Sequence, residues 1–393
     1  MLAIVTSHPI QYQAPLWRAL AAAGVNFEVW FLTPHAVHAS PDKEFGRSFA
    51  WDIDLLSGYP HRFLPVAPGW TLEKFNSICL PQGWAAELRE RKVTTLWIEG
   101  WRFRTLWQAA ATAHGLSIPV WLRGESHDLA PEPWLKHRLK RIALGWLFRR
   151  VDKFLCIGSA NRRFYRQRNI PEARLLSAPY GVDTERFGAA ATELAPSREV
   201  LRRRWNIATD AYCVLFCGKL IAKKRPLDLV AATILAPRVA DRPVHLLFAG
   251  DGELTGQLQT ALKQPGAPAA TFAGFLNQSE IPAALAVADC LVLPSDFGET
   301  WGLVVNEALA SGVPVIVSDH CGCTEDLAAP LGAAHVFPCG DSRALAESLR
   351  TVAANPPPAA TLRQLSESHS PQRTAENVVA ALTARIPSPP LKT

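Results

Sequence analysis

Short apolar runs alternate with longer amphipathic segments along the whole chain. In the first half we predict β-strands at Leu2–Thr6, Phe27–Leu32, Thr95–Ile98, Val120–Leu122 and Phe154–Ile157. In the second half we predict them at Cys213–Cys217, His245–Ala249, Cys290–Leu293 and Val315–Val317. Because these runs are apolar at nearly every position, the pattern is typical of parallel strands that helices cover on both faces. We therefore predict an α/β fold.

The two sets of strands are separated by an Ala-rich stretch, Gly188–Pro196. We expect residues 1–187 to form one Rossmann-like domain and residues 198–370 to form a second. Residues 371–393 are expected to form a C-terminal helix, which can return to the first domain, and a Pro-rich, disordered tail from Ile386. A length of 393 residues agrees with two or three domains.

Composition places the chain among ordinary globular proteins, with 48% hydrophobic and 19% charged residues. No uncharged apolar stretch approaches 18 residues, so no membrane span is expected. Residues 1–9 are predicted to begin with a strand and not with a signal peptide. The eight cysteines show no disulfide or zinc spacing, which indicates a reducing compartment and a cytoplasmic location.

Positive charge is concentrated in the first half of the chain. Residues 1–187 hold 24 Lys and Arg against 16 Asp and Glu, whereas residues 188–393 hold 17 against 19. Residues 134–168 contain 11 basic residues and one acid, interleaved with aromatic side chains. This stretch fits a helix at an anionic membrane surface. A core helix with a solvated basic face fits it slightly better. No RNA-binding or helix-turn-helix signature accompanies the charge, so no nucleic-acid partner is expected.

The most informative segment is Leu293–Asp319, which combines a strand end, a Gly-containing turn, a helix and a second strand. Glu299 lies in the turn, and Glu307 lies on the helix that Trp301 and Gly302 open. The backbone N–H groups at such a helix start lack partners and favour an anion, typically phosphate. A phosphate flanked by carboxylates suits a ligand that is part anion and part polyol, such as a nucleotide-sugar.

Two further turns follow strands in the second half. Gly218 and Lys219 come directly after a strand and are followed by Lys224, an order that suits a phosphate-binding loop. A solvated basic turn is the alternative. The Ala249–Gly252 turn follows the next strand, where a tight turn of this kind is as often structural as functional.

Together these segments resemble the retaining glycosyltransferases of the GT-B fold that carry an E-x7-E motif (glycosyltransferase family 4, group 1). The resemblance rests on Glu299 and Glu307 with the strand that follows them, and on a G-R-L-x-x-x-K-G-like turn in which Lys219 replaces Arg. It implies two Rossmann-like domains whose parallel sheets face one another across a cleft. It also implies that Glu307 holds the ribose and that Lys219 and Lys224 hold the diphosphate. The implied donor-binding residues are Gly218, Lys219, Lys224, Gly250, Phe275, Glu299, Thr300, Trp301, Gly302, Leu303 and Glu307.

The first half contributes a polar loop, Val120–Asp128. Members of the family place a His in this loop opposite the donor sugar, so His127 joins Glu299 and Lys224 as a catalytic candidate. Arg123 and Glu125 are candidates for the acceptor side. The family's Gly-rich loop after the first strand is missing here, and His8 and Gln11 stand in its place, either on the acceptor side or in a structural role.

The triplet Asp52-Ile53-Asp54 resembles the metal-binding motif of a different glycosyltransferase fold, but no other signal supports it. We expect no metal and no cofactor.

The resemblance implies a metal-independent hexosyltransferase. It would move a sugar from a UDP- or GDP-sugar to a glycan or lipid-linked acceptor, in polysaccharide or glycolipid synthesis. A sugar phosphorylase or hydrolase on the same fold and a non-catalytic nucleotide- or glycan-binding protein remain alternatives. A dinucleotide-dependent oxidoreductase would require G-x-G-x-x-G after a first strand, which neither half contains.

Overall fold

The computed structural model describes residues 1–35, 37, 40–42, 47–65, 71, 72, 74–130 and 134–384. The N-terminal domain is built on a parallel seven-stranded sheet of order β5-β2-β1-β6-β7-β8-β9. Its strands are β1 (Leu2–Thr6), β2 (Phe27–Phe31), β5 (His61–Phe63), β6 (Thr95–Glu99), β7 (Val120–Arg123), β8 (Lys153–Cys156) and β9 (Leu175–Ser177). Its helices are α1 (Ala14–Ala22), α2 (Trp84–Glu90), α3 (Arg104–Gly115), α4 (Trp134–Phe148) and α5 (Ser159–Arg166). The strands β3 (Ser40–Asp42) and β4 (Arg47–Phe49) form a separate antiparallel pair.

The second sheet has the order β11-β12-β10-β14-β15-β16, and β13 also pairs with β12. All its pairings are parallel except that of β11. The strands are β10 (Tyr212–Cys217), β11 (Arg238–Val239), β12 (Arg242–Ala249), β13 (Ala269–Gly274), β14 (Cys290–Leu293), β15 (Val315–Ser318) and β16 (Val336–Phe337). The helices are α6 (Thr184–Leu194), α7 (Arg198–Arg204), α8 (Pro226–Leu235), α9 (Thr255–Ala261), α10 (Ile281–Val287), α11 (Leu303–Ala310), α12 (Ser342–Ala354), α13 (Ala359–Glu367) and α14 (Pro371–Thr383).

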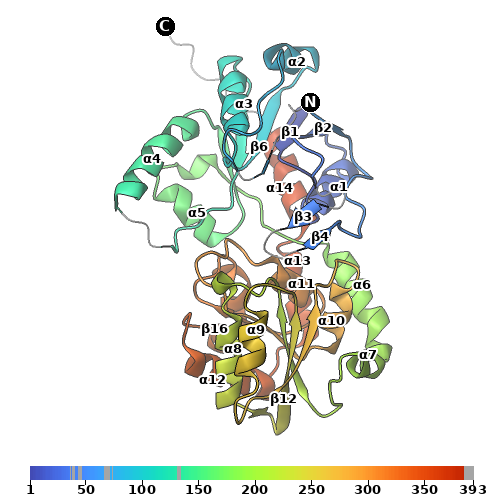
Figure 1. Ribbon diagram of the computed structural model, residues 1–393. Helices are drawn as coiled ribbons and strands as arrows, with labels where there is room; N and C mark the ends of the chain where they lie inside the picture. Colours follow the sequence, from blue (N-terminus) through green and yellow to red (C-terminus); the bar gives the residue numbers. More distant parts are fainter. Residues whose placement is uncertain are drawn as a thin grey trace.

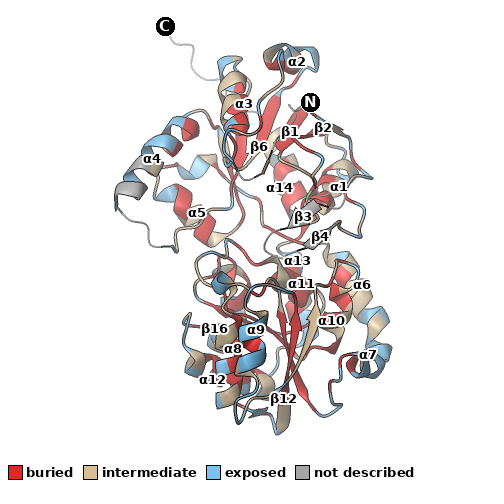
Figure 2. Cartoon of the chain, viewed as in Figure 1, coloured by how far each residue is buried: buried red, intermediate tan, exposed pale blue. Residues whose placement is uncertain are grey.

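The prediction of an α/β fold with two parallel sheets is confirmed, and each predicted strand coincides with an observed one to within two or three residues. The strands that the sequence pattern missed include β5, β9, β13 and β16. Three of these have only two or three residues, and none has the continuous burial that produces an unbroken apolar run. In Figure 2, buried residues concentrate on the two sheets and on the helix faces turned toward them.

Helix α14 follows the second domain in sequence but packs against α1 and β9 of the first. Figure 1 shows it rising from the lower domain into the upper one beside β1. Its Ala375 and Val378 lie in the same buried cluster as Leu2, Ile4 and Trp17. The expected tail from Ile386 lies outside the described residues.

The two domains are in direct contact. The backbone N–H of Ser279 donates to Asp52 (3.1 Å), and Ser159 Oγ donates to Asp326 (2.7 Å). A Cβ atom added to Gly158 would lie 2.2 Å from the ring of Trp301, so only glycine permits this approach between the domains. The strand ends of the two sheets thereby face each other across the space that contains the candidate site.

Candidate active site

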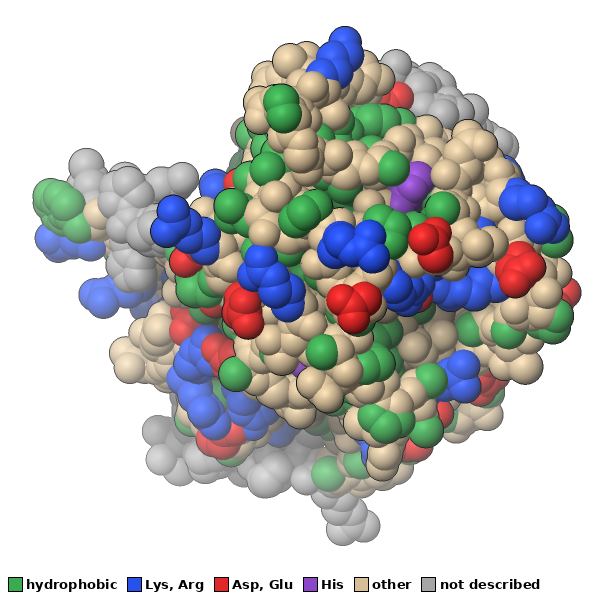
Figure 3. All heavy atoms as spheres, turned by 90° about the horizontal axis from the view of Figure 1, so that it is seen from below, with side chains coloured by type: hydrophobic (Ala, Val, Ile, Leu, Met, Phe, Trp, Pro, Cys, Tyr) green, Lys and Arg blue, Asp and Glu red, His purple; other side chains and the backbone are tan. Residues whose placement is uncertain are grey.

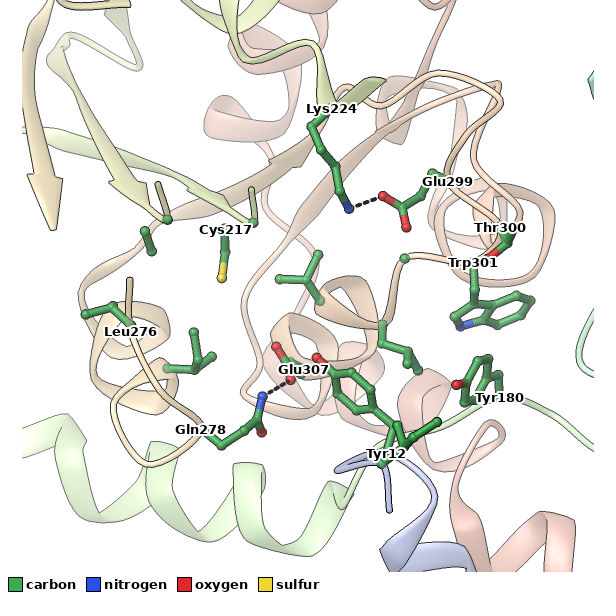
Figure 4. A pocket seen from close by; sticks show the side chains of 18 of the residues that line it. Tyr12, Tyr180, Cys217, Lys224, Leu276, Gln278, Glu299, Thr300, Trp301 and Glu307 are labelled. Atoms are coloured by element: carbon green, nitrogen blue, oxygen red, sulfur yellow. Dashed lines mark hydrogen bonds and ion pairs between the residues drawn. The ribbon is translucent and has the colours of Figure 1, made fainter. Parts of the chain in front are cut away.

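A cavity of about 440 Å³ lies between the two domains, at the carboxyl ends of β10, β12 and β14. The carboxyl ends of parallel strands are where open α/β sheets bind ligands. Figure 4 shows the labelled side chains converging on this space from the lower domain and from the loop after β1. We call it the donor cavity. Its lining includes Tyr12, Trp51, Glu125, Tyr180, Cys217, Gly218, Lys224, Gly250, Phe275, Gln278, Glu299, Thr300, Trp301, Gly302, Leu303, Val304 and Glu307.

Ten of the eleven residues named from the sequence as donor-binding therefore line one space. Lys219 is the exception, because it follows the cavity-lining Gly218 without lining the cavity itself. The two glycine turns touch each other: a Cβ atom on Gly250 would lie 1.9 Å from the carbonyl oxygen of Gly218. Both glycines have positive φ, so a larger residue would be strained as well as crowded.

Lys224 and Glu299 form an ion pair in the lining of the donor cavity, drawn as a dashed line in Figure 4. Their side chains are only 17% and 14% exposed. Burial alone would lower the pKa of Lys224, but the Glu299 carboxylate outweighs this effect and the pKa is raised. The cavity therefore contains a permanent cation beside a carboxylate.

Glu307 is 1% exposed on α11. Gln278 Nε2 donates to its Oε1 (3.3 Å), and Tyr12 also forms a side-chain hydrogen bond with it. Burial raises the pKa of Glu307 to about 7, although both hydrogen bonds and Arg186 act in the opposite direction. Tyr12 comes from the loop after β1, so the first domain contacts the carboxylate that the second domain presents.

Helix α11 begins beside the donor cavity, after a left-handed Gly302. A Cβ atom at Gly302 would lie 2.6 Å from Leu293, so the turn requires glycine. Trp301 has a different role from its neighbours: it is 2% exposed, and its Nε1 donates to Asn306 (2.9 Å). Asn306 donates in turn to the carbonyl of Tyr180 (3.1 Å) in the first domain. The indole therefore fixes the domain junction, while the backbone around it lines the cavity.

His127 does not line the donor cavity. It lies in a neighbouring hollow of about 210 Å³ that shares Thr300 with the donor cavity. The backbone N–H of Leu129 donates to its Nδ1 (3.2 Å), and the backbone of Phe297 and Glu299 accepts from the ring. Burial lowers the pKa of His127, so the ring is neutral at pH 7. His127 thus contacts the backbone of the loop that carries Glu299.

Of the four acceptor-side candidates, Arg123 and Glu125 line one cavity of the N-terminal domain together, whereas His8 and Gln11 do not line it. Glu125 lines the donor cavity, and Arg123 is 3% exposed with its guanidinium 4.6 Å from the ring of Tyr180. Gln11 lines a third cavity on the α1 side. His8 packs edge-on against His35, and burial lowers its pKa to about 3, so it is neutral at physiological pH.

The sequence analysis left several lining residues unassigned to the site, among them Tyr12, Trp51 and Gln278. Trp51 packs against Phe275 with ring centroids 6.5 Å apart, and this contact crosses the domain boundary. Trp51 only precedes the Asp52-Ile53-Asp54 triplet, and Tyr12 and Gln278 adjoin no recognisable motif. The roles of Tyr12 and Trp51 depend on docking of the two domains, which local sequence does not encode, whereas Gln278 meets Glu307 within the second domain.

Asp52 and Asp54 have structural partners. Asp52 accepts from Ser279 of the second domain, and Asp54 accepts from the N–H groups of Leu56 and Ser57 (2.9 and 3.0 Å). A side-chain hydrogen bond with Ser57, together with these backbone hydrogen bonds, lowers the pKa of Asp54 to about 2. Within the described residues, no three His, Cys, Asp or Glu side chains gather in a way that could hold a metal ion. In the same part of the chain, no helix is both long and apolar enough to cross a membrane.

Comparisons with known proteins agree with this architecture. The family model for a glycosyl transferase 4-like domain matches residues 9–181, and the model for glycosyl transferases group 1 matches residues 197–369. Among solved structures, Anabaena HepE in complex with UDP and glucose aligns over 97% of this chain and 98% of its own, with a TM-score of 0.64 at 15% identity. The lipopolysaccharide-biosynthesis glycosyltransferase WaaG aligns over 98% of this chain and all of its own, with a TM-score of 0.64 at 17% identity. These likenesses confirm the GT-B fold.

Two curated relatives come from Mycobacterium tuberculosis. A GDP-mannose-dependent α-(1-6)-phosphatidylinositol dimannoside mannosyltransferase (strain H37Ra) is 32% identical over 243 residues, or 59% of this chain and 58% of that protein. A monomannoside mannosyltransferase of the same type (strain H37Rv) is 28% identical over 66% of this chain and 68% of that protein. The chain thus spans little more than half of the first relative. With the two family models accounting for both domains, the chain belongs to the group 1 glycosyl transferases of the GT-B fold.

Proposed function

We propose that this protein is a retaining, metal-independent hexosyltransferase. It takes a sugar from a GDP- or UDP-sugar and transfers it to a glycan or lipid-linked acceptor. The observation that carries the proposal is the donor cavity, in which the partly exposed Lys224–Glu299 ion pair, the buried Glu307 and the start of a helix meet. The named activities of the two mycobacterial relatives favour GDP-mannose as the first donor to test.

Each part of the cavity suits one part of a nucleotide-sugar. The Gly218 and Gly250 turns present backbone to the cavity at the strand ends, where a diphosphate would bind, and Lys224 supplies positive charge in the same lining. Glu307 accepts hydrogen bonds from ribose hydroxyls, and Glu299 accepts them from the sugar. A diphosphate leaving group gains negative charge as the glycosidic bond breaks. Lys224 and the N–H groups at the start of α11 stabilise that charge without a metal.

Retention of the anomeric configuration follows if the acceptor oxygen attacks the face from which the diphosphate leaves. The bond from the anomeric carbon to the diphosphate oxygen breaks, its electron pair stays on the diphosphate, and the new bond forms to the acceptor oxygen. The acceptor hydroxyl proton passes to the departing diphosphate. This arrangement needs no carboxylate nucleophile. It is consistent with Glu299 being engaged in an ion pair with Lys224.

A thermal-shift screen with GDP- and UDP-sugars tests the donor, because a ligand that binds only the folded state raises the apparent stability. Transfer to glycolipid acceptors is then measured, and NMR of the product assigns the anomeric configuration. Transfer only to phosphate or water would instead identify a phosphorylase or hydrolase. Binding without turnover would identify a non-catalytic protein. If no nucleotide-sugar binds, the proposal is wrong.

We further propose that α4 brings the enzyme to an anionic membrane surface. In Figure 1, α4 projects from the side of the N-terminal domain. Its residues include no acid. Trp134 and Ile142 are each 70% exposed, and the exposed Arg138, Arg141 and Arg149 share their face at helical spacing. Leu144, Leu147 and Phe148 are buried on the other side and anchor the helix to the domain.

The opposite end of the molecule differs in charge pattern. In Figure 3, Lys and Arg side chains lie among Asp and Glu over the far face of the second domain.

A basic lipid-facing residue contributes about 1 kcal/mol on an anionic bilayer. Neutralising Arg138, Arg141 and Arg149 to Gln should therefore abolish most co-sedimentation with phosphatidylglycerol vesicles. The matched control replaces the exposed Arg203, Lys263 and Arg343 with Gln and should retain co-sedimentation. Equal binding to neutral and anionic vesicles would contradict the proposal.

A further inference from the structure

The donor cavity runs along a row of strand ends in the second domain. The pairing places these strands in the order β13, β12, β10 and β14. Lys224 follows β10 and Glu299 follows β14, so the ion pair lies toward one end of the row. At the other end, after β13, the lining includes the apolar Phe275, Leu276 and Ile281. The cavity is therefore charged toward β14 and rich in apolar side chains toward β13, and we call the latter its apolar end.

Trp51 adds a wall at the apolar end, although it belongs to the N-terminal domain. Its ring centroid lies 6.5 Å from that of Phe275, and the two rings are inclined at 41°. At this angle the rings form two adjoining walls and do not stack on one another. Both side chains are half-buried and line the cavity. The N-terminal domain thus presents an indole to the apolar end of the cavity.

Hydrogen bonds fix the backbone on either side of Trp51 to the second domain. Asn277 Nδ2 donates to the carbonyl of Ala50 (2.8 Å), and the N–H of Asp52 donates to Asn277 Oδ1 (3.4 Å). The N–H of Ser279 donates to Asp52 Oδ1 (3.1 Å), and Ser279 Oγ donates to Asp52 Oδ2. We call Ala50, Asp52, Asn277 and Ser279 the clasp. Because Asn277 and Ser279 lie in the loop after β13, the clasp holds the indole at the apolar end.

The order of groups in a nucleotide-sugar matches this division of the cavity. On the proposed function, Glu299 contacts the sugar, Lys224 contacts the diphosphate and Glu307 contacts the ribose. The base is attached to the ribose on the side away from the diphosphate, so it extends toward the apolar end. A nucleobase has a flat π face, and stacking on an aromatic side chain stabilises binding of any base. The apolar end provides aromatic side chains from both domains.

We propose that Trp51 is a donor-binding residue of the N-terminal domain and that its indole packs against the base of the nucleotide-sugar. This inference rests on the proposed function and extends it, because the residues assigned to the donor so far belong to the second domain. Stacking uses the π face that every base has, so Trp51 contributes to the binding of GDP and UDP alike. Asp52 is a positioning residue, because it acts on the donor only by holding Trp51 through the clasp.

Isothermal titration calorimetry of the full-length protein with GDP and with UDP tests the role of Trp51. For whichever nucleotide the wild type binds, Trp51→Ala should weaken binding about tenfold, the effect of removing one stacking partner. Trp51→Phe keeps an aromatic face and should recover most of this loss. The control Trp134→Ala removes an indole that is 70% exposed on α4 and should match the wild type.

The clasp gives a second test, in which the indole itself is kept. Asp52→Ala removes the acceptors of Ser279 and should weaken nucleotide binding about threefold. In the Trp51→Ala background the same replacement should have no further effect, because the side chain that it positions is gone. The matched control is Glu325→Ala. Glu325 is also an exposed carboxylate that bonds across the domain boundary, to Arg163, but it does not line the donor cavity, so affinity should stay unchanged.

The outcomes separate this inference from the proposed function. Equal nucleotide affinity for the wild type and Trp51→Ala overturns the inference alone. An equal loss in Glu325→Ala and Asp52→Ala also overturns it, since general docking of the domains would then control binding. Additive losses from Trp51→Ala and Asp52→Ala contradict the positioning role of Asp52. If circular dichroism shows that Trp51→Ala does not fold, the comparison of Asp52→Ala with Glu325→Ala decides. A wild type that binds neither nucleotide overturns the proposed function itself.

Discussion

Replacing Glu307 with Gln is expected to stabilise the protein above neutral pH while weakening nucleotide binding. Burial raises the pKa of Glu307 from 4.5 to about 7. Between these values the folded state keeps its proton while the unfolded state releases it, so stability falls as the pH rises through this window. The difference of about 2.5 pH units corresponds to about 3 kcal/mol, all of which is lost at pH 8. Gln has the same shape, carries no charge and can still accept from Gln278.

Thermal unfolding at pH 5 and pH 8 measures the effect. For a domain of this size, 3 kcal/mol corresponds to a rise of roughly 6 to 12 °C in the unfolding temperature. We expect most of this advantage at pH 8 and little at pH 5. The control Glu253→Gln changes an exposed carboxylate and should shift neither value. An equal unfolding temperature for wild type and Glu307→Gln at pH 8 would refute the reasoning about burial. Unchanged nucleotide affinity would remove Glu307 from the donor site.

Contacts in and around the donor cavity lead to three further predictions. Lys224→Met leaves the buried Glu299 charge unpaired and should cost about 3–5 kcal/mol in denaturant unfolding. Adding Glu299→Gln should restore much of the lost stability. A double variant that is no more stable than Lys224→Met would contradict the prediction. Sugar transfer should proceed in excess EDTA, whereas activity that EDTA removes and Mg²⁺ or Mn²⁺ restores would show a metal requirement. Gly158→Ala forces a methyl group to 2.2 Å from the Trp301 ring and should abolish transfer in a product assay, whereas Gly256→Ala, with no atom within 4 Å, should not.

The sequence predicted the central strands because complete burial leaves an unbroken apolar run, as in β1 and β10. The short edge strand β5 leaves no such run, since its three residues are half-buried or exposed. The sequence likewise predicted the parts of the site that follow strand ends directly, such as Gly218 and Gly250. It failed for Tyr12, which reaches Glu307 only after the domains dock, and for Gln278, which reaches Glu307 from another segment of the same domain.

His127 and Lys219 show a different limit. Both occupy positions that the resemblance assigns to the site, yet neither lines the donor cavity. Their directions depend on local contacts: the ring of His127 is held by the backbone around Leu129, Phe297 and Glu299. A motif specifies the residue and its loop, but the side-chain direction depends on neighbours that the motif does not contain.

The return of α14 to the first domain determines the order in which the protein can be completed during synthesis. The cluster that joins Ala375 and Val378 to Leu2 and Trp17 unites β1 and α1 with a helix that follows every strand of both sheets in sequence. Domains usually fold in the order in which they leave the ribosome. Here the second domain has all of its strands before α14 exists, so the one cluster of the first domain that α14 completes is buried last. Until then the face of α1 that α14 covers is open to solvent, and this face is where a nascent chain would need protection by a chaperone.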